Sequence, residues 1–281
     1  MNKIRFIANK DTNYVFHMLS VAKCGYDNTY GNHYKHLYPK KDLDVLKKNE
    51  ELITVCGGEH CGVLYGMIVA EPACAKISAK GYYTELIRMA ENKQVPKELE
   101  KYIEIVCQIS EVMIKHYDSY IDTIWNIENK KICEYIPEVL DLFEKSKFTE
   151  KAEEIVGCSL ASDFFTATFV TSVENGAEAI DISKEQDLFG IVRTPIDAFY
   201  FIGHEFIIYL LFEALKHENA FKEFDTWDIT EGLSEFYLKQ VMGDTHIFDR
   251  HQKYVDYFEK CCRSEKLTVV ELYKKGLETL N

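Results

Sequence analysis

Apolar residues recur at intervals of three and four between residues 97 and 126, which is the spacing of one face of an α-helix. The residues that share this face are Leu99, Tyr102, Val106, Ile109, Met113, Tyr117, Tyr120 and Ile124. We therefore predict one long helix over this range. Shorter amphipathic patterns predict further helices at residues 12–22, 136–145, 149–156, 250–262 and 268–280.

Three of these helices carry start signals in the sequence. Pro137 stands near the first residue of the helix predicted from residue 136, where a missing backbone N–H costs nothing. Thr149 can cap the helix that follows it. Thr268, with Glu271 three residues later, forms a capping box for the last helix.

The period of the pattern changes at residues 164–173, which are mostly β-branched and aromatic. Asn175 and Gly176 form a strong two-residue hairpin signal, and residues 177–182 alternate in polarity. A turn at this point pairs Phe169 with Ile182 on the opposite strand. We predict a β-hairpin here and a separate strand over residues 3–8.

The segment after the hairpin predicts a helix from Pro195 to about Leu215. Thr194 can cap it, Pro195 suits its first position, and Asp197 places negative charge in its first turn. The helix is apolar on nearly all faces, so we expect it to be covered by protein. Near its centre it carries one histidine and one glutamate, His204 and Glu205.

Taken together, the patterns predict an α+β protein that is mainly helical. We divide it into a mixed part at residues 1–95, a helical part at residues 96–160 and a third part at residues 161–281. No repeat or low-complexity linker separates them. We expect the three parts to pack as one compact unit.

Charge and hydrophobicity narrow the classes of partner. The formal net charge is -13, so a broad cationic surface for nucleic acid is not expected. The N-terminal residues lack an apolar signal region, and the longest apolar run, residues 198–211, contains His204 and Glu205. These features predict a cytoplasmic protein with no membrane partner.

The 9 cysteines are odd in number and follow no regular spacing, which predicts reduced thiols. The stretch CGGEHC, from Cys56 to Cys61, contains His60 and is followed by Cys74, so metal binding is one interpretation. A glycine-rich turn with inward cysteines is the interpretation that we favour. A second stretch rich in tyrosine and histidine, residues 26–38, either lines a substrate cleft or packs as a loop with its polar tips outward.

We expect the carboxylate of Glu205 in the apolar helix to have a partner, because burying a carboxylate without one costs several kcal/mol. The simplest arrangement is a hydrogen-bonded His204 and Glu205 in the core. A second helix, predicted to be capped by Thr230, carries Glu231 and Glu235 four residues apart and therefore on one face.

With the hairpin, the HE helix and the later EGLSE stretch, residues 163–243 resemble the gluzincins, the thermolysin-like and aminopeptidase-like zinc metallopeptidases. The resemblance implies a zincin-like core. It implies His204 and Glu231 as zinc ligands, Glu205 as the general base, and Glu235 as a carboxylate that orients His204. Zinc is the one cofactor that it implies.

Ile208 departs from the family pattern. The motif HExxH requires a second histidine four residues after the first, and isoleucine has no lone pair to offer a metal. His217 does not lie on the helix face that carries His204. His246 or Tyr237 could stabilise an oxyanion, whereas we expect His246 and His251 to be surface or capping histidines.

Three hypotheses follow from these residues. The first is a zincin-like protein, catalytically inactive or impaired, that binds a peptide or protein in the remnant cleft. The second is an active metal-dependent peptidase in which another group replaces the missing ligand. The third is an unrelated helical protein with a structural His204–Glu205 pair.

Overall fold

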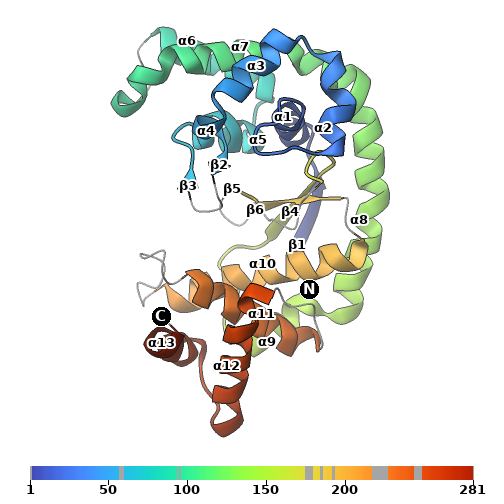
Figure 1. The fold of residues 1–281 in the computed structure, drawn as a ribbon. Helices are drawn as coiled ribbons and strands as arrows, with labels where there is room; N and C mark the ends of the chain where they lie inside the picture. Colours follow the sequence, from blue (N-terminus) through green and yellow to red (C-terminus); the bar gives the residue numbers. More distant parts are fainter. Residues whose placement is uncertain are drawn as a thin grey trace. The chain divides into compact units, whose positions relative to one another are not determined.

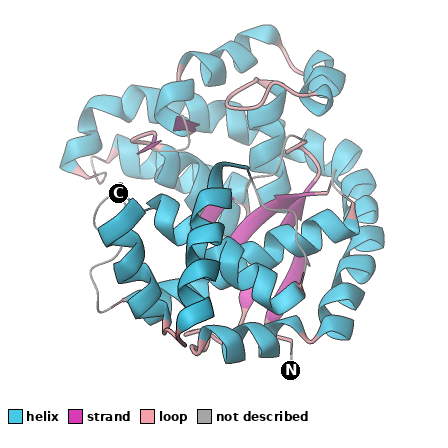
Figure 2. Ribbon diagram, turned by 60° about the horizontal axis from the view of Figure 1, so that its bottom comes forward, coloured by secondary structure: helices cyan, strands magenta, loops and turns pink. Residues whose placement is uncertain are grey.

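Helices dominate the computed structural model, and a small β-sheet completes it (Figures 1 and 2). The prediction of a mainly helical α+β protein is therefore confirmed. The structure describes residues 2–56, 60–92, 94, 96–174, 180–183, 186–191, 194–216, 227–243 and 249–280.

The chain forms two units, each assembled from separate segments. The C-terminal unit contains Met1–Arg5, Pro137–Thr166 and Thr194–Asn281, and the N-terminal unit contains Phe6–Ile136 and Ala167–Arg193. The boundaries expected near residues 95 and 160 do not coincide with these limits. Because the chain crosses between the units several times, neither one is a continuous stretch of sequence.

The N-terminal unit is built largely from α1 (Lys10–Val21), α6 (Ala79–Glu91) and α7 (Ile103–Tyr120). The side chain of Asn9 caps α1 by accepting hydrogen bonds from the backbone of Asp11 and Thr12. The predicted apolar face of residues 97–126 is confirmed, since it is buried from Val106 to Ile124. The backbone there is less regular than predicted, with a 3₁₀ helix at Lys97–Tyr102 before α7 and a π-helical turn at Ile121–Trp125 after it. Shorter elements of this unit are α2 (Thr29–Tyr34), α3 (Lys40–Lys48), α4 (Glu50–Ile53), β2 (Val55–Cys56), β3 (His60–Cys61), the π-helical turn Gly66–Ala70 and α5 (Glu71–Cys74).

Two predicted helix starts are wrong. The helix expected from residue 136 is part of α8 (Asn126–Ser146), which continues through Pro137. Pro137 is exposed, so water can satisfy the carbonyl that loses its helical partner. The next helix, α9 (Phe148–Val156), begins before Thr149 and follows Lys147, whose φ is 51°. Thr149 is buried in the first turn instead of capping it.

The main sheet contains β1 (Ile4–Ala8), β4 (Phe165–Val170), β5 (Ile180–Ser183) and β6 (Gln186–Gly190), in the order β1-β4-β6-β5. The strand expected at residues 3–8 is therefore present. A side chain of α1 reaches the sheet, because the amide of Asn13 donates to the carbonyl of Phe169 at 3.0 Å.

A hairpin does precede the apolar helix, but its predicted pairing is wrong. β5 pairs antiparallel with β6, with Ile180 opposite Leu188, and β6 separates β5 from β4. The expected turn at Asn175 and Gly176 lies outside the described residues. The strand with buried Leu188 and Phe189 takes the inner position, where both edges are paired, and β5 takes the edge.

After the sheet, the described residues of the C-terminal unit form the helices α10 (Pro195–Leu215), α11 (Trp227–Met242), α12 (Gln252–Ser264) and α13 (Val269–Leu280). The predicted start of α10 is confirmed, because the Thr194 side chain accepts a hydrogen bond from the backbone of Asp197. The capping box of Thr268 and Glu271 is also present. α10 is long and apolar enough to span a membrane, but 67% of that window is buried in the protein, as in a core helix.

The predicted start of α11 is wrong. Thr230 does not cap this helix but lies buried inside it, three residues after Trp227. The preceding residue, Ile229, is also buried and packs where Gly276 of α13 leaves room. Burial of this apolar turn stabilises helical structure before Thr230.

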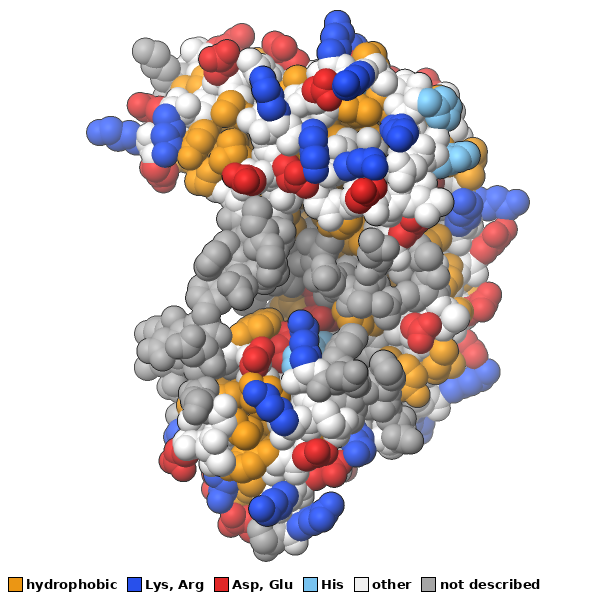
Figure 3. All heavy atoms as spheres, in the orientation of Figure 1, with side chains coloured by type: hydrophobic (Ala, Val, Ile, Leu, Met, Phe, Trp, Pro, Cys, Tyr) orange, Lys and Arg blue, Asp and Glu red, His pale blue; other side chains and the backbone are white. Residues whose placement is uncertain are grey.

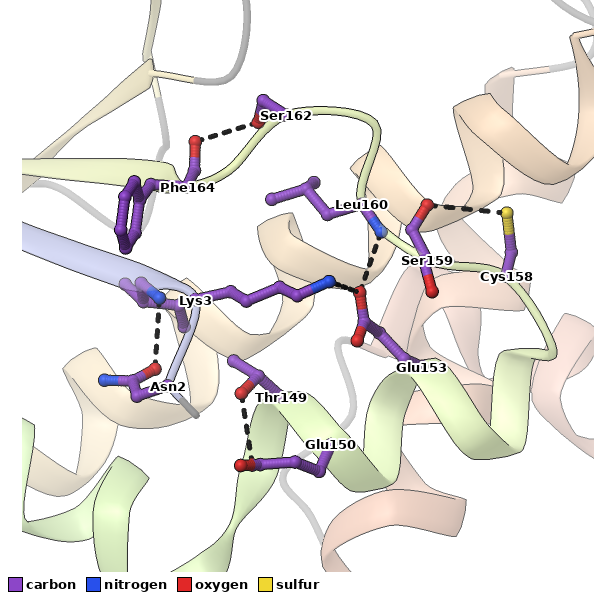
Figure 4. A network of polar contacts seen from close by, with 11 residues as sticks. Asn2, Lys3, Thr149, Glu150, Glu153, Cys158, Ser159, Leu160, Ser162 and Phe164 are labelled. Carbon is purple, nitrogen blue, oxygen red and sulfur yellow. Dashed lines mark hydrogen bonds and ion pairs between the residues drawn. The ribbon is translucent and has the colours of Figure 1, made fainter.

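Close to its start the chain is tied to α9 by polar contacts (Figure 4). Nζ of Lys3 lies 2.6 Å from Oε1 of Glu153, and the same oxygen accepts from the backbone of Leu160 at 2.9 Å. The carbonyl of Lys3 accepts from the backbone of Phe165 at 2.9 Å. These bonds join the first strand to α9 and to the start of β4.

Candidate functional site

Two glycines allow the helices of the C-terminal unit to approach closely. A Cβ at Gly203 of α10 would lie 2.9 Å from the ring of Phe148 and 3.2 Å from Leu238 of α11. A Cβ at Gly232 of α11 would lie 2.2 Å from Cβ of Tyr254 on α12. The residues next to these glycines, His204 and Glu231, are therefore held in a tightly packed region.

His204 and Glu231 form the centre of the candidate site. Nε2 of His204 lies 3.0 Å from Oε2 of Glu231, and both side chains are largely buried. Burial by itself would lower the pKa of His204, but the hydrogen bond to Glu231 and the charges of nearby carboxylates raise this pKa to about 9. Burial by itself would raise the pKa of Glu231, but the hydrogen bond with His204 and the nearby positive charges together lower this pKa. The two groups therefore form an imidazolium–carboxylate pair at neutral pH.

Glu235 lies on the other side of the same imidazole. Its Oε1 is 3.7 Å from Nδ1 of His204, and its side chain is 1% exposed. Nδ1 of His204 and Oε2 of Glu235 have no hydrogen-bond partner among the described residues. This is the position expected for a carboxylate that orients the histidine, at a distance longer than a direct hydrogen bond.

His251 is a site residue that the sequence analysis missed. It was expected at the surface or at a cap, and it does stand at the N-cap position of α12. It is only 1% exposed, however, and its Nδ1 lies 3.7 Å from Oε1 of Glu235. It belongs to the 3₁₀ helix Asp249–His251 directly before α12. The signal was present in the sequence, because Tyr254, Val255 and Phe258 follow it at helical spacing and form the buried face of α12.

The remaining predicted site residues have different surroundings. Glu205 is partly exposed next to His204, and its charge contributes to the raised pKa of that imidazole. Ile208 is 2% exposed and lies one turn after His204 on α10. Tyr237 is buried, and burial raises its pKa. Its oxyanion role stays a prediction, while His217 and His246 lie outside the described residues.

His204 and Glu231 meet only part of what a zinc ion needs. Nitrogen and oxygen atoms 3.0 Å apart, as in His204 and Glu231, can both lie about 2 Å from one ion. Zinc sites in proteins use at least three protein ligands. In the part of the chain that the structure describes, no group of three or more His, Cys, Asp or Glu side chains is arranged to hold a metal.

The described part of the CGGEHC stretch is limited to backbone, so it does not test metal binding by these side chains. Its backbone forms the short antiparallel pair of β2 and β3, with Cys56 opposite His60. The side chains of these residues, and residues 57–59 between the strands, lie outside the described part. Cys74 is partly buried.

The tyrosine-rich segment at residues 26–38 is not a loop with outward polar tips. It contains α2 and a 3₁₀ turn, and the hydroxyls of Tyr30 and Tyr38 bind the two ring nitrogens of buried His17 at 2.5 and 2.7 Å. Tyr30 also donates to the carboxylate of Glu128, and Tyr120 donates to its other oxygen at 2.5 Å. The polar tips of these tyrosines therefore point into the N-terminal unit.

The surface carries charged side chains of both signs. On the face drawn in Figure 3, Lys and Arg are interspersed with Asp and Glu.

Comparisons with known proteins find no matching family model, no matching curated protein and no matching solved structure.

Proposed function

We propose that the chain is a zincin-like protein whose metal-binding set is broken at Ile208, that it is catalytically inactive or impaired as a peptidase, and that it binds a peptide or protein. The contact of 3.0 Å between His204 and Glu231 carries this proposal. These residues come from two helices, and the resemblance to the gluzincins assigns them as the first and third zinc ligands.

Loss of hydrolysis follows from the state of the pair. Protonated His204 has no lone pair for a metal, and Ile208 has none in any state. Glu205 then has no metal-bound water from which to remove a proton. Because Glu205 is partly exposed, a bound peptide could still reach its carboxylate.

The test uses the full chain and a mixed peptide library. Mass spectrometry should detect no cleavage, and the chain should retain a subset of peptides that Glu205→Gln no longer retains. Glu213→Gln is the matched control, because Glu213 lies on the same helix and pairs with Lys216. Cleavage that is lost in His204→Ala would contradict the proposal, and so would equal retention by both Gln variants.

A second candidate is an active metal-dependent hydrolase with a substitute ligand. Burial of His251 beside Glu235 is the observation that favours it. Protein purified without chelator should then contain about one zinc per chain and lose it in His204→Ala. Metal content that is unaffected by this substitution would remove the candidate.

A further inference from the structure

The buried polar network of the N-terminal unit joins side chains from several helices. Nδ1 and Nε2 of His17, on α1, contact the hydroxyls of Tyr30 and Tyr38 at 2.5 and 2.7 Å. Tyr30 also donates to Oε1 of Glu128 on α8, and Tyr120 of α7 donates to Oε2 at 2.5 Å. One line of hydrogen bonds therefore begins at Tyr38, which is 7% exposed, and ends at Glu128, which is 1% exposed.

A π-helical turn brings the groups at the buried end together. Tyr120 and Glu128 are eight residues apart, and in a regular α-helix their side chains would point about 80° apart. The π-helical turn Ile121–Trp125 lies between them and is wider by one residue, which brings both side chains to one face. The helix is therefore distorted where it carries the end of the hydrogen-bonded line.

The direction of each hydrogen bond follows from the ionised carboxylate. An ionised Glu128 only accepts, so the hydroxyl hydrogen of Tyr30 is committed to it, and the bond between Tyr30 and His17 takes its hydrogen from Nδ1. Burial lowers the pKa of His17 to about 3, so at neutral pH the ring carries no second N–H. Its Nε2 then accepts from the hydroxyl of Tyr38. Every donor in the line points toward Glu128.

We propose that this line is a proton wire that carries a proton from solvent at Tyr38 to the buried carboxylate of Glu128. Each proton moves by one hydrogen bond, from Tyr38 to Nε2 of His17 and from Nδ1 to the oxygen of Tyr30. The former proton of Tyr30 moves to Oε1 of Glu128, and Tyr38 regains a proton from water. The line then holds one added proton, on Glu128, and the imidazole is in its other tautomer. Every hydrogen bond of the line is kept, with its direction reversed.

The partners of Glu128 decide which of its oxygens takes the proton. A proton on Oε2 would face Tyr120, whose only hydrogen bond among the described residues is the one to Glu128, so its hydroxyl would lose its acceptor. The hydroxyl of Tyr30 has a second partner in His17 and can turn its hydrogen there. The proton is therefore placed on Oε1.

The surroundings of Glu128 favour uptake of a proton as the pH falls. Burial raises the pKa of its carboxyl above the ordinary value of 4.5, although hydrogen bonds and the charge of Lys131 lower it. Burial also raises the pKa of each tyrosine that faces Glu128 or His17 in the described part of the chain, namely Tyr30, Tyr34, Tyr38 and Tyr120. The tyrosines therefore stay neutral, and Glu128 is the group that titrates.

This inference goes beyond the proposed function and does not depend on it, because the N-terminal unit does not contain His204. Histidine side-chain NMR of the full, ¹⁵N-labelled chain tests it, since the two ring nitrogens report which one carries the hydrogen. His17 should carry it on Nδ1 at about pH 8 and on Nε2 at about pH 4. The change should follow the protonation of Glu128, which carboxyl ¹³C NMR measures in the same sample.

Three variants separate the wire from simple packing. Glu128→Gln should show the Nε2–H form of His17 already at about pH 8, because its neutral amide donates to Tyr30 as the protonated acid does. Tyr30→Phe cuts the line, so the tautomer of His17 should no longer follow Glu128. Tyr34→Phe is the matched control, since the Tyr34 ring packs 5.6 Å from that of His17 but lies outside the line. The tautomer should change in this control as in the unmodified chain.

Four outcomes would overturn the inference. An Nε2–H form at about pH 8 in the unmodified chain would contradict the direction of the line, and a Glu128 still ionised at about pH 4 would contradict proton uptake. A constant tautomer of His17 while Glu128 titrates would contradict the wire. If Tyr30→Phe does not fold, Glu128→Gln decides, because an Nδ1–H form in that variant would contradict the coupling.

Discussion

The hydroxyl of Ser234 donates a hydrogen bond of 2.8 Å to the backbone carbonyl of His204, and both groups are buried. This bond joins α11 to α10 at the residue that carries the candidate chemistry. It lies between Glu231 and Glu235 along α11, so the two carboxylates and the imidazole are held by one local contact between the helices.

Ser234→Ala should therefore lower the free energy of unfolding by about 1–3 kcal/mol, because a buried carbonyl loses one of its partners. Urea unfolding followed by circular dichroism measures the change. Thr84→Ala is the matched control, since the exposed Thr84 hydroxyl also donates to a helix carbonyl, that of Lys80, at 2.8 Å. An equal loss in both variants would mean that the bond to His204 contributes no more to the free energy of unfolding than the exposed bond does.

His204 should titrate near pH 9 in the folded protein, above the ordinary histidine pKa of 6.5. Its pairing then contributes fully to stability below about pH 6.5, and this contribution is lost as the pH rises from there through about 9. Histidine side-chain NMR measures the pKa, and urea unfolding across this range measures the linkage.

Glu231→Gln is the informative comparison, because it removes the carboxylate but keeps the shape. The pKa of His204 should fall in this variant, and the loss of stability between about pH 6.5 and 9 should become smaller. A His204 signal that titrates near 6.5 in the unmodified chain would contradict the ion pair.

Gly232→Ala should destabilise the C-terminal unit, because the new Cβ would lie 2.2 Å from Cβ of Tyr254. Overpacking of this kind costs about 1–3 kcal/mol or more. Gly66→Ala is the control, since nothing lies within 4 Å of its added Cβ and alanine favours helical structure there. Thermal unfolding should show a lower midpoint for the first variant and an equal or higher one for the second.

Glu128→Gln tests the buried tyrosine network of the N-terminal unit. An amide cannot accept from both Tyr30 and Tyr120 as the carboxylate does, so we expect a loss of about 1–3 kcal/mol at pH 5. Burial raises the pKa of Glu128 despite hydrogen bonds that lower it, so the ionised group costs stability as the pH rises above about 4.5.

The deficit of this variant should therefore shrink between pH 5 and pH 7. Glu134→Gln is the control, because Glu134 is exposed and has only a long ion pair of 3.8 Å with Lys130. A deficit that does not change with pH would argue that Glu128 has an ordinary pKa.

Local signals in the sequence were sufficient where the structure depends on neighbours in the chain. The start of α10 at Pro195 and the capping box at Thr268 were predicted correctly, because a cap bonds backbone groups only a few residues away. The same kind of signal failed at Thr149 and Thr230, where burial of the adjacent turns extended each helix past the expected cap.

Spacing also anticipated part of the site. Residues four apart share a helix face, so Glu231 and Glu235 were expected to act together, and the resemblance placed His204 with them. Their meeting at 3.0 and 3.7 Å agrees with that expectation. Whether the group binds metal or peptide stays a proposal.

Only the tertiary structure decided which distant segments became neighbours. It inserted β6 between β4 and β5, although a strong turn signal predicted that β4 would pair with the next strand. It also buried His251 beside Glu235 and directed Tyr30 and Tyr38 toward His17. These contacts depend on competition for burial among residues far apart in the chain, and a pattern of local spacing contains no measure of that competition.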